Sequence, residues 1–190
     1  MTRRSKATSS SNESSQPGAG AELISVNGWG IAFHPQILLQ VERLIAAVEK
    51  ERQGGAKLTP PSQPARILAT LRKLIFVDIP GDPTRAIYRQ GHTLGAHRKH
   101  WFRAKFGNGR YRLFFRFHTR ERILLFAWVN DENTLRTYGS STDAYATFGG
   151  MLDNGNPPDD WDDLLKACTN EETIRRFKRI FDTLQGRRPH

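Results

Sequence analysis

The sequence has a single cysteine, Cys168, among its 190 residues. One cysteine cannot form an intramolecular disulfide, which excludes a disulfide-stabilised scaffold and a cysteine-rich zinc site. No stretch approaches the roughly 18 consecutive apolar residues of a membrane span, and the mean hydropathy is −0.59. The basic N-terminus is not followed by an apolar segment of the kind found in secretory signals. We therefore expect a cytoplasmic protein with no membrane partner.

Acidic residues are also scarce. The chain has 19 Asp and Glu against 29 Lys and Arg, which gives a formal net charge of +10 and an isoelectric point near 10.3. A chain this basic attracts polyanions, so the composition points to a nucleic acid or another acidic partner. The length of 190 residues is typical of one domain built around one core.

Composition divides the chain into three parts. Residues 1–22 are rich in Ser and Gly and have almost no large apolar side chains, so we expect this segment to be disordered. Residues 23–166 carry the hydrophobic patterning of a folded domain. Residues 167–190 are predicted to form a C-terminal helical extension.

The patterned part predicts an α+β domain with a mostly antiparallel, twisted sheet. Apolar side chains recur with a helical period in two segments that follow a bent first strand, and an Asn-Gly turn joins two strands of a hairpin. We expect the two N-terminal helices to pack on one face of the sheet and the C-terminal helices to be short. The expected strands are 23–33, 101–106, 110–117 and 122–129, and the expected helices are 35–51, 65–76, 142–152 and 171–184.

The positive charge is concentrated in the predicted hairpin. Nine Lys and Arg lie between Arg98 and Arg122, against one acidic residue. Side chains two positions apart share a face of a strand, so this charge gathers on one face, which we expect to be exposed, while the opposite apolar face packs against the helices. The candidate RNA-binding residues of this region are four cations that would contact phosphates and one ring that would stack on a base: Arg98, Lys99, Arg110, Arg116 and Phe114.

A basic sheet face has a simpler explanation, because exposed Lys and Arg also prevent strands from aggregating at their edges. We favour binding of a nucleic-acid backbone, since like charges on one face repel each other unless an anion neutralises them. No spacing of His and acidic residues indicates a metal site, and the carboxylates at 159–163 are expected to form a solvated helix start. RNA cleavage needs no metal or cofactor, because the 2′-OH is the nucleophile. Neighbouring arginines disfavour the protonated form of a lysine, so such a lysine can act as the general base. An arginine can bind two oxygens of the phosphate at once.

Two segments of the sequence carry a resemblance to a known family. They are WFRAKFGNGRYRLFFRF at 101–117 and WVNDENTLRTYG at 128–139. Both resemble the YhaV family of bacterial toxins, within the RelE-like superfamily of ribonuclease toxins in type II toxin–antitoxin systems. The resemblance covers about residues 26–161, with further support from VNGW at 26–29, HP at 34–35, TDAY at 142–145 and GNPPDDW at 155–161.

The resemblance implies a RelE-like fold for residues 23–166 and an endonuclease that cleaves mRNA on the translating ribosome, which inhibits translation and growth. It implies no metal and no cofactor. The implied protein partner is an antitoxin of the AbrB/SpoVT type, and operator DNA would be contacted only through the complex with that antitoxin.

The resemblance also implies that Arg103, Lys105 and Arg112 surround the scissile phosphate and that Tyr138 helps to orient the mRNA base. From these positions we hypothesise the following roles. Lys105 would be the general base toward the 2′-OH, and Arg103 and Arg112 would stabilise the pentacoordinate phosphate. Tyr138 would stack on or orient a base. Arg136 would donate a proton or hold the phosphate.

One position departs from the superfamily. A basic residue usually precedes the aromatic residue by about six positions, and this chain has Glu132 there. Arg136 could take over the missing charge, or Asn130, Asp131 and Glu132 could define a different site. The general acid therefore has more than one candidate.

Two other functions are compatible with the same residues. The chain could be a non-catalytic nucleic-acid-binding regulatory module that uses the same basic face. It could also be an adaptor whose basic face meets an acidic protein, and an acidic antitoxin segment would use that same surface.

Overall fold

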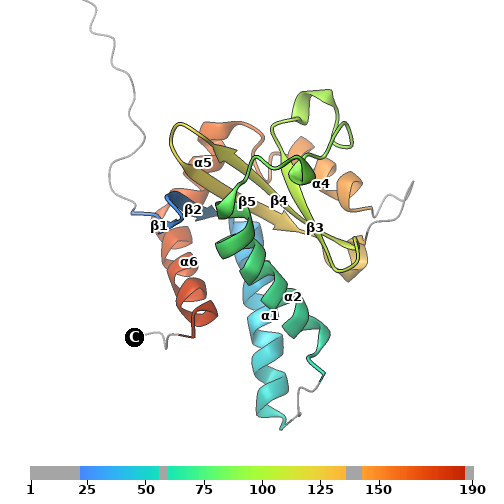
Figure 1. The fold of residues 1–190 in the computed structure, drawn as a ribbon, viewed down its shortest axis with the longest axis vertical. Helices are drawn as coiled ribbons and strands as arrows, with labels where there is room; N and C mark the ends of the chain where they lie inside the picture. The colour runs from blue at the N-terminus through green and yellow to red at the C-terminus, as the bar shows by residue number, and fades with distance from the viewer. Residues whose placement is uncertain (1–21, 56–59, 136–142, 187–190) are drawn as a thin grey trace, which may run out of the picture.

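The computed structural model describes residues 22–55, 60–135 and 143–186 (Figure 1). Its centre is a five-stranded sheet with the order β1-β2-β5-β4-β3. The pair β2–β5 is parallel and the other three pairs are antiparallel, which confirms the α+β prediction with a mostly antiparallel sheet. The strands are β1 (Ile24–Val26), β2 (Trp29–Phe33), β3 (Phe102–Phe106), β4 (Tyr111–His118) and β5 (Ile123–Val129).

The predicted first strand is wrong in one respect. Residues 23–33 form two antiparallel strands rather than one bent strand. Asn27 and Gly28 lie between them with φ of 49° and 74°. Two consecutive residues with positive φ form the tight turn that Asn-Gly favours in hairpins, so the chain reverses instead of bending.

Six α-helices are present in the part of the chain that the structure describes. They are α1 (Pro35–Gln53), α2 (Gln63–Lys73), α3 (Ile79–Gly81), α4 (Ala144–Asp153), α5 (Trp161–Thr169) and α6 (Glu171–Leu184). A π-helical turn at Leu74–Asp78 joins α2 to α3. In Figure 1, α1 runs away from the sheet, and α2 returns toward the sheet alongside α1. None of the helices described here has the length and apolar character needed to cross a membrane.

Alternate residues of the strands enter two different hydrophobic cores. Phe33, Phe115 and Phe126 belong to the first core, together with side chains of α1, α2 and α6. Phe114 and Leu125 belong to the second core, together with side chains of α4 and α5. Both faces of the sheet are therefore covered.

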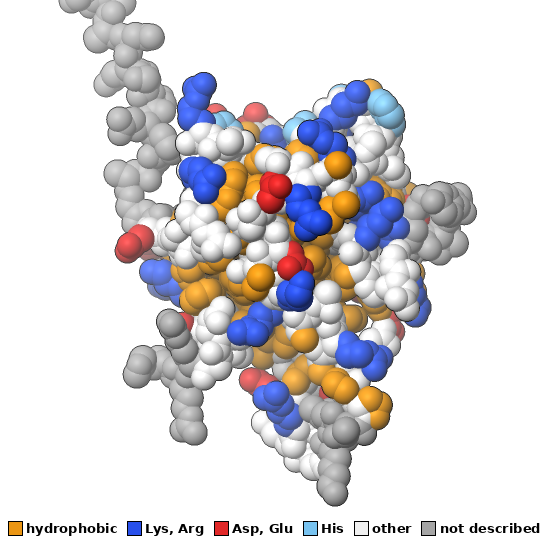
Figure 2. All heavy atoms as spheres, in the orientation of Figure 1, with side chains coloured by type: hydrophobic (Ala, Val, Ile, Leu, Met, Phe, Trp, Pro, Cys, Tyr) orange, Lys and Arg blue, Asp and Glu red, His pale blue; other side chains and the backbone are white. Residues whose placement is uncertain are grey.

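The predicted exposure of the basic sheet face is therefore wrong. Large apolar residues of the strands point to that face as well, and α4 and α5 supply the apolar side chains that bury them. Figure 2 shows Lys and Arg side chains spread over the visible face of the molecule rather than gathered in one continuous stripe. Side chains on this face can reach solvent only at its rim, where β3 forms one edge of the sheet.

Candidate active site

The hairpin of β3 and β4 brings three of the predicted site residues together. Lys105 is directly opposite Arg112, and Arg103 is opposite Phe114, two positions along the same strand. The register is set by the turn at 107–109, whose three residues all have positive φ. Because side chains two apart share a face, Arg103, Lys105 and Arg112 lie on the same side of the sheet.

The three cations differ in their exposure. Lys105 is exposed, whereas Arg103 and Arg112 are only 9% and 5% exposed. The covering residue is Tyr145, at the start of α4. Its hydroxyl accepts a hydrogen bond of 3.0 Å from Arg103 Nε. Its ring centroid lies 5.3 Å from Cζ of Arg112.

Neutral groups hold both buried arginines. Besides the bond to Tyr145, Arg103 Nη1 donates to the carbonyl of Ile87. Arg112 Nη1 donates to the carbonyl of Gly109 at 2.9 Å. The Nε–H of Arg112 is buried and has no acceptor among the residues that the structure describes.

No ion pair to a carboxylate is found for Arg103, Lys105 or Arg112 within residues 22–55, 60–135 and 143–186. Two other arginines with low exposure are paired: Arg98 with Asp153 and Asp159, and Arg176 with Glu42. Burying an uncompensated cation is unfavourable. The hairpin therefore keeps a local positive charge that an anion can neutralise.

Asn130 fixes the backbone beside Arg112. This buried side chain accepts a hydrogen bond from the Arg112 N–H and donates to the carbonyls of Arg110 and Thr134, at 3.1 Å and 3.0 Å. A buried Asn directly after the apolar strand β5 is the sequence signal for such a role. Asn130 thus acts as a structural bridge between β4 and the segment that follows β5.

The neighbouring acidic residues of that segment are exposed. Asp131 caps the short 3-10 turn Glu132–Thr134, where its carboxylate accepts from the Asn133 and Thr134 N–H groups. Glu132 lies in the turn itself. The other two predicted site residues, Arg136 and Tyr138, lie outside the described residues, and their roles stay predictions.

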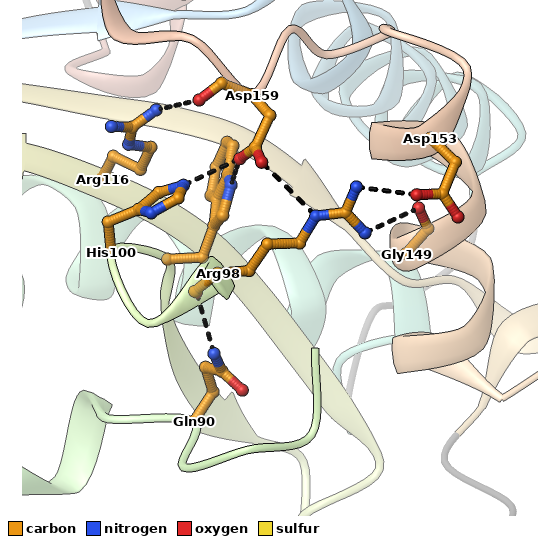
Figure 3. A network of polar contacts seen from close by, with 8 residues as sticks. Gln90, Arg98, His100, Arg116, Gly149, Asp153 and Asp159 are labelled. Carbon is orange, nitrogen blue, oxygen red and sulfur yellow. Dashed lines mark hydrogen bonds and ion pairs between the residues drawn. The ribbon is translucent and has the colours of Figure 1, made fainter. Parts of the chain in front are cut away.

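The predicted RNA-binding residues fall into two groups. Lys99 and Arg110 are exposed, as a phosphate contact requires. Arg98 is 8% exposed, and its guanidinium donates to Asp153 at 2.7 Å, to Asp159 at 3.4 Å and to the carbonyl of Gly149 (Figure 3). The expectation that Arg98 is a free surface cation is wrong, because these carboxylates already neutralise it.

Asp159 is the centre of that network (Figure 3). Its carboxylate is 2.7 Å from His100 Nε2 and accepts a hydrogen bond of 2.6 Å from Trp101 Nε1. Burial raises the pKa of the Asp159 carboxyl, but the hydrogen bonds from His100, Trp101 and Arg98 outweigh it, so that the pKa lies below its usual value. Asp159 therefore departs from the expected solvated helix start, whereas Asp162 and Asp163 are exposed in the first turn of α5.

Arg116 belongs to the same network. Its Nη1 donates to the carbonyl of Asp159 at 2.7 Å. Its guanidinium lies 5.5 Å from the Trp101 ring and 5.2 Å from the Trp161 ring. Cation–π contacts on these rings fix Arg116 in place. Half-buried Arg116 thus attaches the segment before α5 to the sheet, rather than facing solvent as expected.

Phe114 is completely buried. Its ring stacks on Phe148 of α4 at 4.2 Å and on Trp128 of β5 at 5.8 Å. The expectation of an exposed ring that can stack on an RNA base is wrong, because α4 covers the position.

Among the described residues, no three His, Cys, Asp or Glu side chains are grouped so that they could hold a metal ion. The groups that come together at the rim of the sheet are cations and a tyrosine. Such a set can bind an anion and stabilise negative charge that develops on it.

Comparison with known proteins identifies similar sequences. Residues 31–169 match a family described as a toxin with endonuclease activity, of a toxin–antitoxin system. The ribonuclease toxin YhaV of Escherichia coli strain K12 is 42% identical over 149 residues, which cover 78% of this chain and 96% of that protein. Toxin YhaV of Escherichia coli O157:H7 gives the same values. No solved structure matches the chain.

Proposed function

Since this chain belongs to the YhaV family, the toxins with endonuclease activity of toxin–antitoxin systems, we propose that it is a ribonuclease that cleaves mRNA without a metal. The site is the rim of the β3–β4 hairpin, with Arg103, Lys105 and Arg112. The mRNA would be cut on the translating ribosome in the cytoplasm, so that translation and growth stop. The name of the Escherichia coli relative, a ribonuclease toxin, supports RNA as the substrate.

One observation carries this proposal. Among the residues that the structure describes, buried Arg103 and Arg112 have neutral partners only and lie beside an exposed lysine, whereas buried Arg98 is paired with carboxylates. Like charges opposite each other on neighbouring strands destabilise a sheet. A phosphodiester bound at this place would offset that repulsion, and two guanidinium groups match the oxygens of a phosphate.

The proposed reaction is transesterification within the RNA. The 2′-oxygen attacks the adjacent phosphorus while Lys105 accepts its proton. Arg103 and Arg112 stabilise the additional negative charge of the pentacoordinate phosphate. The bond between phosphorus and the 5′-oxygen then breaks, and the leaving oxygen takes up a proton. The products are a 2′,3′-cyclic phosphate and a 5′-hydroxyl.

Two residues outside the described part of the chain complete this proposal. Arg136 would give the leaving oxygen its proton or hold the phosphate. Tyr138 would orient a base. Exposed Lys99 and Arg110 would contact the RNA backbone on either side of the reacting phosphate.

The regulatory partner is an antitoxin, since the family acts in toxin–antitoxin systems. We propose an antitoxin of the AbrB/SpoVT type, whose complex with this chain would contact operator DNA. An acidic segment of the antitoxin on the hairpin would compete with RNA for the same cations.

Cleavage of labelled mRNA in a translation extract and in buffer with EDTA tests the proposal. The wild type should produce fragments with 5′-hydroxyl ends, and Lys105→Ala and Arg112→Ala should each lower the rate at least about 100-fold. Arg120→Ala is the matched control, since Arg120 is an exposed cation in the β4–β5 turn. Full cleavage by both site variants would overturn the assignment. RNA binding without cleavage, and without growth arrest on expression, would instead identify a non-catalytic RNA-binding module.

A further inference from the structure

Tyr145 contacts both buried arginines of the hairpin with different parts of one side chain. The hydroxyl accepts from Arg103 Nε at 3.0 Å, and the ring lies under the Arg112 guanidinium at 5.3 Å. We propose that Tyr145 is a positioning residue that holds Arg103 and Arg112 in the geometry required for the reacting phosphate. The inference rests on the proposed function, since it names a further residue of that site.

The chemistry of tyrosine suits this task better than a carboxylate does. Asp or Glu between the two guanidinium groups would hold them firmly, but it would neutralise their charge and compete with the phosphate. A phenol hydroxyl accepts one hydrogen bond, and an aromatic ring attracts a cation without neutralising it. Tyr145 therefore fixes two mutually repelling cations and leaves their charge available to the substrate.

Tyr145 is itself held rigidly. Its N–H donates at 2.9 Å to the carboxylate of Asp143, the N-cap of α4. Its ring meets the Phe114 ring edge to face at 5.6 Å, and Phe114 stacks on Phe148. The second core thus fixes the ring that touches the arginines. Rigid support of this kind is what a site needs when a displacement of about 1 Å can lower the rate 100-fold.

Two substitutions separate the two contacts. Tyr145→Phe removes the hydroxyl and keeps the ring, so Arg103 Nε loses its acceptor while Arg112 keeps its ring contact. Tyr145→Leu removes both contacts. We expect kcat for RNA cleavage to fall about 10-fold in the first variant and about 100-fold or more in the second, with KM changed less than about threefold.

Tyr111→Phe is the matched control. Tyr111 is also a buried tyrosine of the hairpin, but its hydroxyl accepts from Gln63, and its side chain packs in the first core. This variant loses a buried tyrosine hydroxyl without touching the arginines. A purely structural role for Tyr145 would give the two Phe variants equal losses of stability in urea and equal kcat per folded molecule.

Binding of an RNA with a 2′-deoxy nucleotide at the cleavage point adds a readout that does not depend on turnover. Its affinity for Tyr145→Phe should stay within about threefold of wild type, because the cations remain present. A Tyr145→Phe variant with wild-type kcat would overturn this inference alone. A wild-type protein that cleaves no RNA would overturn the proposed function, and this inference with it.

Discussion

Lys105 and Arg112 are directly opposite each other in the antiparallel pair of β3 and β4. Natural sheets usually place opposite charges or apolar side chains at such positions, because like charges repel across the pair. Here two cations are opposite each other, and in addition the buried Nε–H of Arg112 has no acceptor among the described residues. Unfavourable local electrostatics of this kind are expected where a protein binds an anion.

Substitution of Lys105 should separate stability from activity. Lys105→Gln removes the repulsion on Arg112, so we expect the free energy of unfolding in urea to rise by up to about 1 kcal/mol. The same variant should lose RNA cleavage, since the proposed base is gone. Lys50→Gln is the control, because exposed Lys50 lies in α1, away from this strand pair and outside the proposed site. A Lys105→Gln protein that is less stable than wild type would contradict the electrostatic account.

Asp159 is predicted to stabilise the fold without taking part in cleavage. Asp159→Ala leaves the Trp101 indole N–H and the buried Arg98 guanidinium without this acceptor. We expect the free energy of unfolding in urea to fall by about 2 to 4 kcal/mol. Asp159→Asn keeps one acceptor oxygen and should therefore lose less stability than Asp159→Ala. RNA cleavage per folded molecule should stay within about twofold of wild type in both variants, and a selective loss of kcat would indicate a catalytic role for this network.

Phe114 supplies the sharpest test of the second core. Its ring is completely buried between Phe148 and Trp128. Phe114→Ala should destabilise the protein by about 3 to 5 kcal/mol, whereas Phe114→Leu should lose less because it fills more of the cavity. Differential scanning calorimetry and urea titration measure the effect. Unchanged stability together with weaker RNA binding would show instead that the ring faces the substrate.

His34 should make stability depend on pH. Burial lowers the pKa of the His34 imidazole to about 4 from 6.5, and the ring caps α1 by accepting the Gln36 N–H. The unfolded chain therefore binds a proton at this histidine at a higher pH than the folded protein does. The contribution of neutral His34 to stability is complete above pH 6.5 and is lost as the pH falls toward 4. We expect a loss of roughly 2 to 3 kcal/mol between pH 7 and pH 4.5.

Urea titrations of wild type and His34→Asn at the two pH values isolate this effect. Asn can cap the helix but does not titrate, so it should remove most of the difference between the two pH values. An equal loss of stability in both proteins would assign the pH dependence to other groups.

Local sequence signals were sufficient for the hairpin and for the helices around it. The Asn108-Gly109 turn predicts β3 and β4, and apolar periodicity predicts α1 and α2. The covering of the second sheet face could not be predicted in this way. Side chains of α4 and α5 reach that face from far along the chain, and strand alternation alone does not tell which face remains open.

The candidate site, too, could be predicted from the sequence only where its residues are close together along the chain. Alternation correctly places Arg103 and Lys105 on one face and Arg112 beside them. Tyr145 lies 42 positions after Arg103, and nothing in the local pattern connects the two. Sequence alone also treats Arg98 and Lys99 as equivalent cations, although a carboxylate 61 positions after Arg98 neutralises only one of them.

Arg98 and Arg110 should therefore respond differently to the same substitution. Arg110 is exposed, so Arg110→Ala should leave the urea midpoint unchanged and weaken RNA binding. One lost phosphate contact should also make the slope of log K against log salt shallower by about 0.7, the value for a single strand. Arg98→Ala breaks the ion pairs of buried Arg98 with exposed Asp153 and half-buried Asp159, so it should lower stability and leave the salt slope of the folded protein unchanged. Fluorescence titrations of labelled RNA at several salt concentrations compare the two, and a shallower slope for Arg98→Ala would mean that Arg98 leaves its carboxylates to contact RNA.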